Sequence, residues 1–322
     1  MNFGSRLNKA FSAFTDREIV SGGNLRKIEA QLGEISLRLD SMQRQIQAAS
    51  PLSPTEAAHL ERYRLEQNML AAWQGPARDE LVARIRALLA KLRPMQAVGY
   101  KKARFGSPND GGYVLLDDFR NIDTVLSFGV EHNAEFDLQM AGRGMSVRQF
   151  DHTIESAPAQ HPSIRWEKKR IAAELTSDTR TISSVLSECD RGREAPHTIL
   201  KIDIEHDEWP VFDAAPLHDL GRFAQITGEF HGFDYLAQRK RLEVAERVFN
   251  KLSQAFAVIH VHANNHCDVT HLLGFSIPYV LEFTLVNRSL YELKESDEVF
   301  PGPLDAPCDP GRPDIALGAF RF

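Results

Sequence analysis

From about residue 100 onward, short runs of apolar, β-branched and aromatic residues alternate with helix-like segments, and this alternation limits the fold most. The runs are 124–130, 146–151, 164–171, 198–204, 224–230, 257–261 and 279–286. The helix-like segments between them include 135–141, 181–188, 209–217 and 235–255. Strands that alternate with helices imply a mostly parallel sheet with helices on both faces. Seven runs with a late strand pair predict a doubly wound α/β sheet with one antiparallel strand.

The first ninety or so residues follow a different, helical pattern. After a Ser-Gly-Gly-Asn break at 21–24, apolar residues recur three and four positions apart, at Leu25, Ile28, Leu32, Ile35, Leu39, Met42 and Ile46. This a/d seam of about three heptads favours a coiled coil over about 24–48 that assembles three or four copies of the chain. The alternative is a helix that folds back on its own bundle. We expect a helical extension over 1–95 and an α/β domain over 96–322.

Composition limits the partners and the compartment. The formal net charge of −6 argues against a broad nucleic-acid surface. The three cysteines form no CxxC pair, and the chain has no run of 18 apolar residues, so we expect a cytoplasmic protein without a transmembrane helix. An apolar stripe at Phe3, Leu7, Phe11 and Phe14 favours a helix packed on its own protein. The alternative is contact with a partner or with the inner membrane surface.

Acidic and imidazole side chains gather where the predicted strands end. They are Glu131, Asp151, Asp203, Glu205, Glu229, His231, His260 and His262. Ligands of doubly wound sheets bind outside the carboxyl ends of the strands. Carboxylates rarely occupy such positions without a partner, because their desolvation is costly. The sequence therefore predicts a reacting centre at this edge.

Three segments carry a resemblance to a known family. Residues 200–205 (Leu-Lys-Ile-Asp-Ile-Glu), followed by Asp-Glu-Trp at 207–209, resemble the "lKiDiEgaEw" segment of FkbM-type methyltransferases and related methyltransferase-like proteins. Residues 110–115 (Asp-Gly-Gly-Tyr-Val-Leu) resemble their "DGGYv" entry segment, and 125–130 resemble their first strand and cofactor loop. The resemblance covers about residues 100–290. It implies a Rossmann-like methyltransferase sheet that binds S-adenosylmethionine.

The resemblance also implies which residues contact the cofactor. Phe128, Gly129 and Glu131 correspond to the cofactor loop, where a glycine lets the backbone approach the ligand. This loop departs from the usual pattern, because Gly129 is its only glycine. Asp151, with His152 beside it, is placed to accept hydrogen bonds from both ribose hydroxyls. The alternative role for Asp151 is a helix N-cap.

The entry segment is expected to close over the methionine end of the cofactor. Its residues are Asp110, Gly111, Gly112 and Tyr113. The alternative is a plain Asp-Gly turn. Asp203 is expected to face the same end of the cofactor.

The acids and histidines also suggest a metal site. In related O-methyltransferases a divalent metal is held at the ends of the fourth and fifth strands, which implies Asp203 and Glu229, with His231 as a third ligand. His260 or His262 would complete the set, because residues two apart on a strand point the same way. Such ligands suit manganese, magnesium, iron or zinc.

Two readings compete with the metal site. His231 or His260 can instead act as a metal-free general base, and both are candidate catalytic residues with Asp203. The histidines can also be structural. Lys201 is expected to be a buried cation paired with an acid such as Glu205.

The sequence thus predicts methyl transfer from S-adenosylmethionine to a hydroxyl, with divalent-metal assistance as an option. A sugar or glycan acceptor is favoured because 260–265 (His-Val-His-Ala-Asn-Asn) resembles a segment of relatives encoded with polysaccharide-assembly enzymes. Asparagine side chains also suit sugar hydroxyls. The alternatives are methylation of a small metabolite or a protein side chain, or a non-catalytic binding module assembled by its coiled coil.

Overall fold

The structure, a computed structural model, describes residues 34, 37–41, 54–189 and 195–322. Its helices are α3 (Pro54–Ala71), α4 (Pro76–Lys91), α5 (Glu135–Gly142), α6 (Ile182–Cys189), α7 (Glu208–Ala214), α8 (Leu217–Leu220), the 3₁₀ helix η1 (Phe233–Ala237) and α9 (Arg239–Ala255). Its strands are β1 (Met95–Ala97), β2 (Lys102–Gly106), β3 (Gly112–Leu116), β4 (Thr124–Phe128), β5 (Ser146–Phe150), β6 (Ile164–Glu167), β7 (Arg170–Ile171), β8 (Thr179–Arg180), β9 (Thr198–Ile202), β10 (Phe223–His231), β11 (Phe256–Ala263), β12 (Val269–Leu272), β13 (Phe275–Pro278), β14 (Val280–Asn287) and β15 (Leu293–Glu295).

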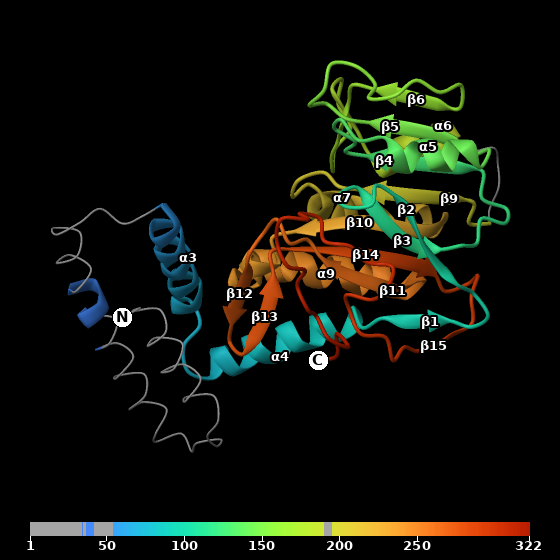
Figure 1. Cartoon of the computed structure of the whole chain (residues 1–322). Coiled ribbons are helices and arrows are strands. Elements are labelled where there is room, and N and C mark those ends of the chain that lie inside the picture. Colours follow the sequence, from blue (N-terminus) through green and yellow to red (C-terminus); the bar gives the residue numbers. More distant parts are fainter. Residues whose placement is uncertain (1–33, 35–36, 42–53, 190–194) are drawn as a thin grey trace. The chain divides into compact units, whose positions relative to one another are not determined.

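A seven-stranded sheet is the centre of the fold (Figure 1). Its strand order is β11-β14-β10-β9-β4-β5-β6. Strands β6, β5, β4, β9 and β10 run parallel, whereas β14 runs antiparallel to both β10 and β11. The predicted doubly wound sheet with one antiparallel strand is confirmed, and all seven predicted runs supply its strands. The run at 164–171 splits into β6 and β7, and β7 pairs with β8.

The order of the sheet changes direction at β4. This strand pairs with β5 on one side and with β9 on the other, although β9 follows it in the chain by about seventy residues. A gap opens at such a switch point, because the chain leaves the two neighbouring strands in opposite directions. The carboxyl ends of β4, β5 and β9 meet there.

The two faces of the sheet carry different covers. The β2–β3 hairpin and α5 pack over β4, β5 and β9 through a cluster that includes Tyr113, Phe136 and Val125. On the other face, Trp209 of α7 packs edge-to-face against Phe230 of β10, and Phe249 of α9 packs against the same ring at a tilt. Because successive residues of a strand point to opposite faces, Glu229 and His231 lie on the face covered by the hairpin.

Sequence reasoning missed the small strand pairs around the main sheet. They are β2–β3, β12–β13 and β1–β15. The β2–β3 turn contains Asp110 and Gly111, and Gly111 has φ +76. Strands of three to five residues have too short an alternation of apolar and polar residues to be distinguished from a loop. The Asp-Gly turn expected as the alternative is present, and the turn borders the cavity described below.

The N-terminal predictions fall mostly outside the described residues. The coiled-coil segment at about 24–48 is described at residues 34 and 37–41, which are helical. The apolar stripe at Phe3, Leu7, Phe11 and Phe14 lies outside the described residues. Among the helices that the structure describes, none is long and apolar enough to cross a bilayer.

Candidate active site

A cavity of about 490 Å³ lies at the switch point of the sheet, within the usual range of roughly 300–1,000 Å³ for small-molecule sites. Most of the predicted site residues line it: Asp110, Gly111, Tyr113, Gly129, Glu131, Asp151, His152, Asp203, Glu229 and His231. Gly112, Phe128, His260 and His262 are outside the lining. The cavity therefore joins the loop after β4 to the acids at the ends of β9 and β10.

The cavity wall is acidic. Its lining contains eight carboxylate residues, Asp110, Glu131, Asp137, Asp151, Asp203, Glu205, Asp207 and Glu229, and three basic residues, Lys169, Arg170 and Lys201. The phenol oxygen of Tyr113 is buried and has no hydrogen-bond partner among the described residues. A cationic ligand with polar groups fits such a wall better than an anionic ligand does.

Gly129 is required by packing against the neighbouring strand. Its φ is +70, and a Cβ at this position would lie 1.6 Å from the carbonyl oxygen of Asp203. Its amide donates a 2.9 Å hydrogen bond to the carbonyl of Phe150. The predicted glycine position is present, but its closest constraint is the backbone after β9. That contact explains the glycine at 129.

Asp151 holds the loop after β4. One carboxylate oxygen accepts hydrogen bonds of 2.9 Å from the amides of Val130 and Glu131, and the other accepts from the amide and hydroxyl of Thr153. Burial opposes the charge, but these hydrogen bonds keep the pKa of Asp151 below its usual value. Four bonds use the acceptor capacity of a carboxylate. No helix begins after Asp151, so the N-cap alternative is wrong.

His231 and Glu208 form a buried pair. His231 Nδ1 lies 3.0 Å from Glu208 Oε1, and the same oxygen accepts a hydrogen bond of 3.0 Å from the amide of Ile204. His231 Nε2 faces the cavity side, 3.4 Å from Glu229 and 3.5 Å from Glu205. Burial lowers the pKa of His231, but the hydrogen bond and charge of Glu208 outweigh it, so the pKa is raised.

Sequence reasoning missed Glu208 as a site residue. Glu208 belongs to the Asp-Glu-Trp sequence that follows residues 200–205. Because it is the first residue of α7, its carboxylate was interpreted as an ordinary acidic group in the first turn of a helix. Its side chain is fully buried. Glu208 lies six residues after the end of β9, and no local sequence signal shows that it is buried.

Burial also changes Asp203 and Glu229. Desolvation raises the pKa of Asp203 to about 6, opposed by the charges of Lys201 and His231. Desolvation and repulsion from Asp203 raise the pKa of Glu229 well above its usual value. A protonated Glu229 carboxyl can donate a hydrogen bond, and its other oxygen accepts from Asn264 at 3.0 Å.

Lys201 has other partners than the predicted one. Its ammonium group donates to the carbonyl of Gly129, lies 4.0 Å from an oxygen of Asp203 and sits over the ring of Tyr113. The prediction of a buried cation paired with an acid is confirmed, but the acid is Asp203, whereas the side chain of Glu205, the acid named as an example, is 82% exposed. Lys201 fixes the loop after β4 against β9.

His260 and His262 are absent from the cavity wall. His260 Nε2 bonds to Asp305 at 2.7 Å, and His262 lies between Glu282 and Asp314. The expectation that they face the pocket is wrong, because β11 is an edge strand and the C-terminal segment covers this part of it. His260 therefore has no ring nitrogen that faces the cavity, as the predicted role of general base requires.

The asparagines of the same segment are also committed to the protein. The amide group of Asn264 donates to Glu229, and its oxygen accepts from the amide of His266. Asn265 donates to carbonyls of the C-terminal segment, including those of Asp309 and Arg312. The contacts of these asparagines therefore give no support for binding of sugar hydroxyls.

One group in the cavity has the spacing of metal ligands. Candidate ligand atoms of Asp203, Glu205 and His231 all lie within 4.8 Å of one another. The predicted set had Glu229 in place of Glu205. The donor set, two carboxylates and one imidazole, fits a divalent ion such as manganese, iron or zinc.

The strand order identifies the class of fold. Numbered in chain order, the sheet reads 6-7-5-4-1-2-3 with strand 7 antiparallel, which is the arrangement of class I S-adenosylmethionine-dependent methyltransferases. With the cavity at the carboxyl ends of strands 1, 2 and 4, the α/β domain has the fold of this class.

The comparisons with known proteins agree with this class. The chain is 31% identical over 136 residues to the human protein named "Probable methyltransferase-like protein 24", over 38% of this chain and 36% of that protein. The match thus spans about a third of the relative's length. No protein-family model matches the chain.

Solved structures give only weak likenesses. One is the 1,6-didemethyltoxoflavin-N1-methyltransferase of Burkholderia thailandensis with bound 1,6-didemethyltoxoflavin and S-adenosylhomocysteine, at 14% identity and a TM-score of 0.27 over 74% of this chain and 92% of that one. Another is a fibrillarin/Nop5p complex, at 9% identity and a TM-score of 0.33 over 61% of this chain and 98% of that one. At such TM-scores these likenesses decide neither fold nor function.

Proposed function

We propose that the chain transfers a methyl group from S-adenosylmethionine to a hydroxyl of an acceptor. The observation that carries this proposal is that one acidic cavity joins the loop after β4 to the His231–Glu208 pair. A donor held at the loop and an alcohol beside His231 would share that cavity. The proposed activity needs both binding regions in one space, because the reacting atoms must come into line.

The residues of the wall fit the cofactor. Glu131 lies beside the loop, and its carboxylate makes no hydrogen bond or ion pair with the described part of the chain. We therefore assign the ribose hydroxyls to Glu131, in place of Asp151, whose oxygens hold the loop. The Tyr113 hydroxyl and the carboxylate of Asp110 would contact the methionine end. S-Adenosylmethionine supplies an electrophilic methyl group on a sulfonium.

His231 is the proposed general base. Glu208 accepts the Nδ1 proton, which leaves the Nε2 lone pair directed toward the cavity. When Nε2 takes the hydroxyl proton of the acceptor, the resulting imidazolium is stabilised by the buried Glu208 carboxylate. A base of raised pKa is a stronger proton acceptor, so the pair suits an alcohol better than an isolated imidazole does.

A divalent ion is the second candidate for activating the hydroxyl. The spacing of Asp203, Glu205 and His231 favours it. An ion held there would lower the pKa of a bound hydroxyl. The two candidates separate by chelation, because base catalysis continues after exhaustive treatment with EDTA and metal-assisted catalysis stops.

Sugar or glycan hydroxyls are the acceptor class to test first, with small metabolites as the alternative. The cavity wall farthest along the chain consists of Asn264, His266, Cys267 and Tyr279. The Asn264 side chain is bonded to Glu229 and His266, but His266 is exposed, and polar groups of this kind fit a hydroxylated acceptor. Methylation of a protein side chain is the third acceptor class.

Two experiments test the function. Calorimetry with S-adenosylhomocysteine is expected to show saturable one-site binding, and its absence would point to a non-catalytic module. Radiolabelled S-adenosylmethionine, incubated with panels of monosaccharides, nucleotide sugars, small phenols and small amines, is expected to label one class of hydroxyl acceptor. Labelling of amines but not of alcohols would overturn the proposed reaction.

We also propose that residues 24–48 assemble copies of the chain, as their heptad pattern suggests. Light scattering coupled to size exclusion is expected to give three or four copies for the full chain. Leu32→Glu, on the seam, should lower this number, whereas Gln31→Glu beside it should not.

A further inference from the structure

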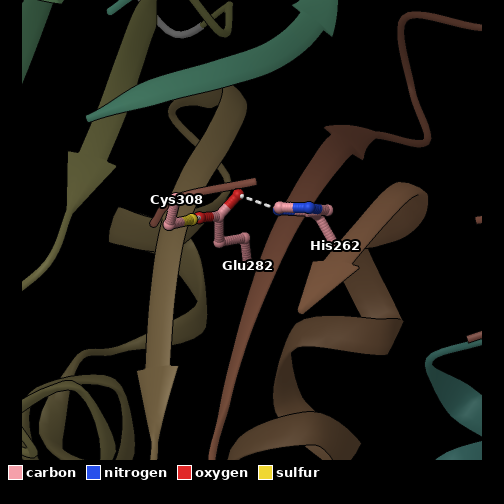
Figure 2. A group of neighbouring side chains, drawn as sticks. All are labelled: His262, Glu282 and Cys308. Atoms are coloured by element: carbon pink, nitrogen blue, oxygen red, sulfur yellow. Dashed lines mark hydrogen bonds and ion pairs between the residues drawn. The ribbon is translucent and has the colours of Figure 1, made fainter. Parts of the chain in front are cut away.

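A second cluster of side chains with metal-binding chemistry lies outside the cavity. It consists of His262 of β11, Glu282 of β14 and Cys308 of the C-terminal segment, all buried (Figure 2). His262 Nδ1 lies 3.0 Å from Glu282 Oε2, and the Cys308 thiol lies 3.0 Å from Glu282 Oε1. Figure 2 shows the carboxylate of Glu282 between the imidazole and the sulfur.

We propose that His262, Glu282 and Cys308 bind a divalent zinc-class cation. One candidate ligand atom from each residue lies within 4.8 Å of the others. Thiolate, imidazole and carboxylate are the three ligand types that zinc uses in proteins, at about 2.0–2.3 Å from the ion. Rotation of the Glu282 carboxylate, so that one of its oxygens contacts the ion, would bring the three ligand atoms to the spacing of a tetrahedral site. A water molecule would take the fourth position.

The fold brings these three residues together through its strand register. His262 and Glu282 are direct cross-strand partners of β11 and β14, so their side chains share one face. Cys308 is held nearby because Asn265 donates to the carbonyls of Asp309 and Arg312, just after it. All three residues are therefore positioned before any ion arrives.

A carboxylate on the far side of His262 completes the arrangement. Asp314 lies 3.1 Å from Nε2, the ring nitrogen that the ion does not use. A metal-bound histidine usually donates its second N–H to such a carboxylate, which fixes the ring orientation and strengthens the nitrogen as a ligand. Asp314 is thus a positioning residue for the proposed ion.

Charge and protons balance in the exchange. When His262 is an imidazolium, Nδ1–H donates to Glu282 and Nε2–H to Asp314, and the Cys308 thiol also donates to Glu282. The ion takes the place of the two protons that face Glu282, so that neutral imidazole, thiolate and carboxylate face two positive charges. Binding releases up to two protons, and affinity falls as pH falls.

This site is separate from the proposed active site. Glu282 is the cross-strand partner of Glu229, but neither His262, Glu282 nor Cys308 lines the cavity. The ion would fix the C-terminal segment on the β11–β14 edge. The proposal therefore stands or fails independently of the methyl-transfer proposal.

Cobalt spectroscopy tests the site on the full chain. After chelation and dialysis, addition of Co²⁺ is expected to produce a thiolate-to-cobalt charge-transfer band with one-to-one stoichiometry. Zn²⁺ should then remove the band by competition. Titration of the protein with Co²⁺ that produces no thiolate band would overturn the proposal.

Substitutions show which cysteine is responsible. Cys308→Ser should abolish the band, whereas Cys189→Ser and Cys267→Ser should keep it. The Cys267 control is needed because this residue lines the cavity near the other candidate metal group. A band lost in Cys267→Ser but kept in Cys308→Ser would place the ion in the cavity and overturn the proposal.

Two further measurements keep the test decisive if Cys308→Ser fails to fold. Asp314→Asn should weaken Zn²⁺ binding by about 10–100-fold, the usual effect of removing such an outer hydrogen-bond partner. In the unsubstituted protein, Zn²⁺ should protect Cys308 from alkylation in a mass-spectrometric map. Because Cys308 is buried, the map is made in urea at the foot of the unfolding transition, and equal alkylation of Cys308 there with and without Zn²⁺ would contradict the proposal.

Discussion

Two clusters of histidine and carboxylate lie on the same face of the sheet, and they differ in what covers them. Around His231, Nε2 lies at the cavity wall, 3.4 Å from Glu229 and 3.5 Å from Glu205, and the side chain of Glu205 is largely exposed. Around His262 the C-terminal segment supplies Asp314 and Cys308, so both ring nitrogens have protein partners. The same residue types thus border an open cavity around His231, whereas around His262 the C-terminal segment closes them into a buried cluster.

The largest expected effect concerns the cluster around His231. His231→Asn should lower the rate of methyl transfer by about 10²–10⁴-fold, because the general base is lost. Binding of S-adenosylhomocysteine should stay within a few-fold of normal. Steady-state kinetics with the labelled acceptor and calorimetry measure the two quantities. His218→Asn, at an exposed position, is the control, and equal rates in the two variants would remove His231 from the mechanism.

Glu208→Gln sharpens the same point through pH. Since the Glu208 charge helps to raise the pKa of His231, its removal should move the rising limb of the rate–pH profile to lower pH. The maximal rate should fall less than in His231→Asn. A merely structural Glu208 would change the rate but leave the position of the limb unaltered.

The cluster around His262 predicts that the free energy of unfolding of the metal-free protein depends on pH. Burial lowers the pKa of His262, but Glu282 and Asp314 outweigh it and raise the pKa to about 9. A raised histidine pKa contributes stability that is fully present below the unfolded value of about 6.5 and is lost as pH rises through about 9. The loss is on the order of 3 kcal/mol.

Urea unfolding in EDTA across that pH range measures this loss. His262→Gln should show a flatter profile over the same range, because the group that titrates has been removed. A wild-type profile that is flat through pH 9 would show that His262 is not charged between its two carboxylates.

The comparison also explains what could be predicted from sequence. The strand runs were long and apolar enough to give all seven strands of the sheet, and the strand-end rule brought Asp203, Glu229 and His231 to one cavity. The same rule failed for His260 and His262. Their partners Asp305 and Asp314 lie 45 and 52 residues later in the chain. No local sequence pattern predicts that the C-terminal segment covers these two histidines.

Glu208 and Asp151 illustrate a second limit of local patterns. Both were visible as acids near strand ends, but their roles depend on which backbone amides point at them. The carboxylate of Asp151 accepts hydrogen bonds from the backbone amides of Val130, Glu131 and Thr153. That geometry is set by the loop after β4, whose shape follows from packing on β9.

The loop after β4 provides a fourth prediction. Gly129→Ala should lower the free energy of unfolding by about 2–5 kcal/mol, because positive φ costs about 1–2 kcal/mol and the clash with Asp203 about 1–3 more. Gly144→Ala is the matched control, since Gly144 has φ +90 with nothing within 4 Å of the added Cβ. It should cost only the backbone strain. Equal losses in urea unfolding would show that the loop can move away from β9.

The smallest expected effect separates the two acids beside the loop. Glu131→Gln should weaken S-adenosylhomocysteine binding about tenfold, which corresponds to about 1.4 kcal/mol, while the free energy of unfolding stays the same. Asp151→Asn should instead lower stability, since its carboxylate accepts hydrogen bonds from the loop. Glu135→Gln, on the exposed first turn of α5, is the control for charge alone. If Asp151→Asn weakens binding without any loss of stability and Glu131→Gln has no effect, the ribose hydroxyls belong to Asp151 and the loop holds its shape without that carboxylate.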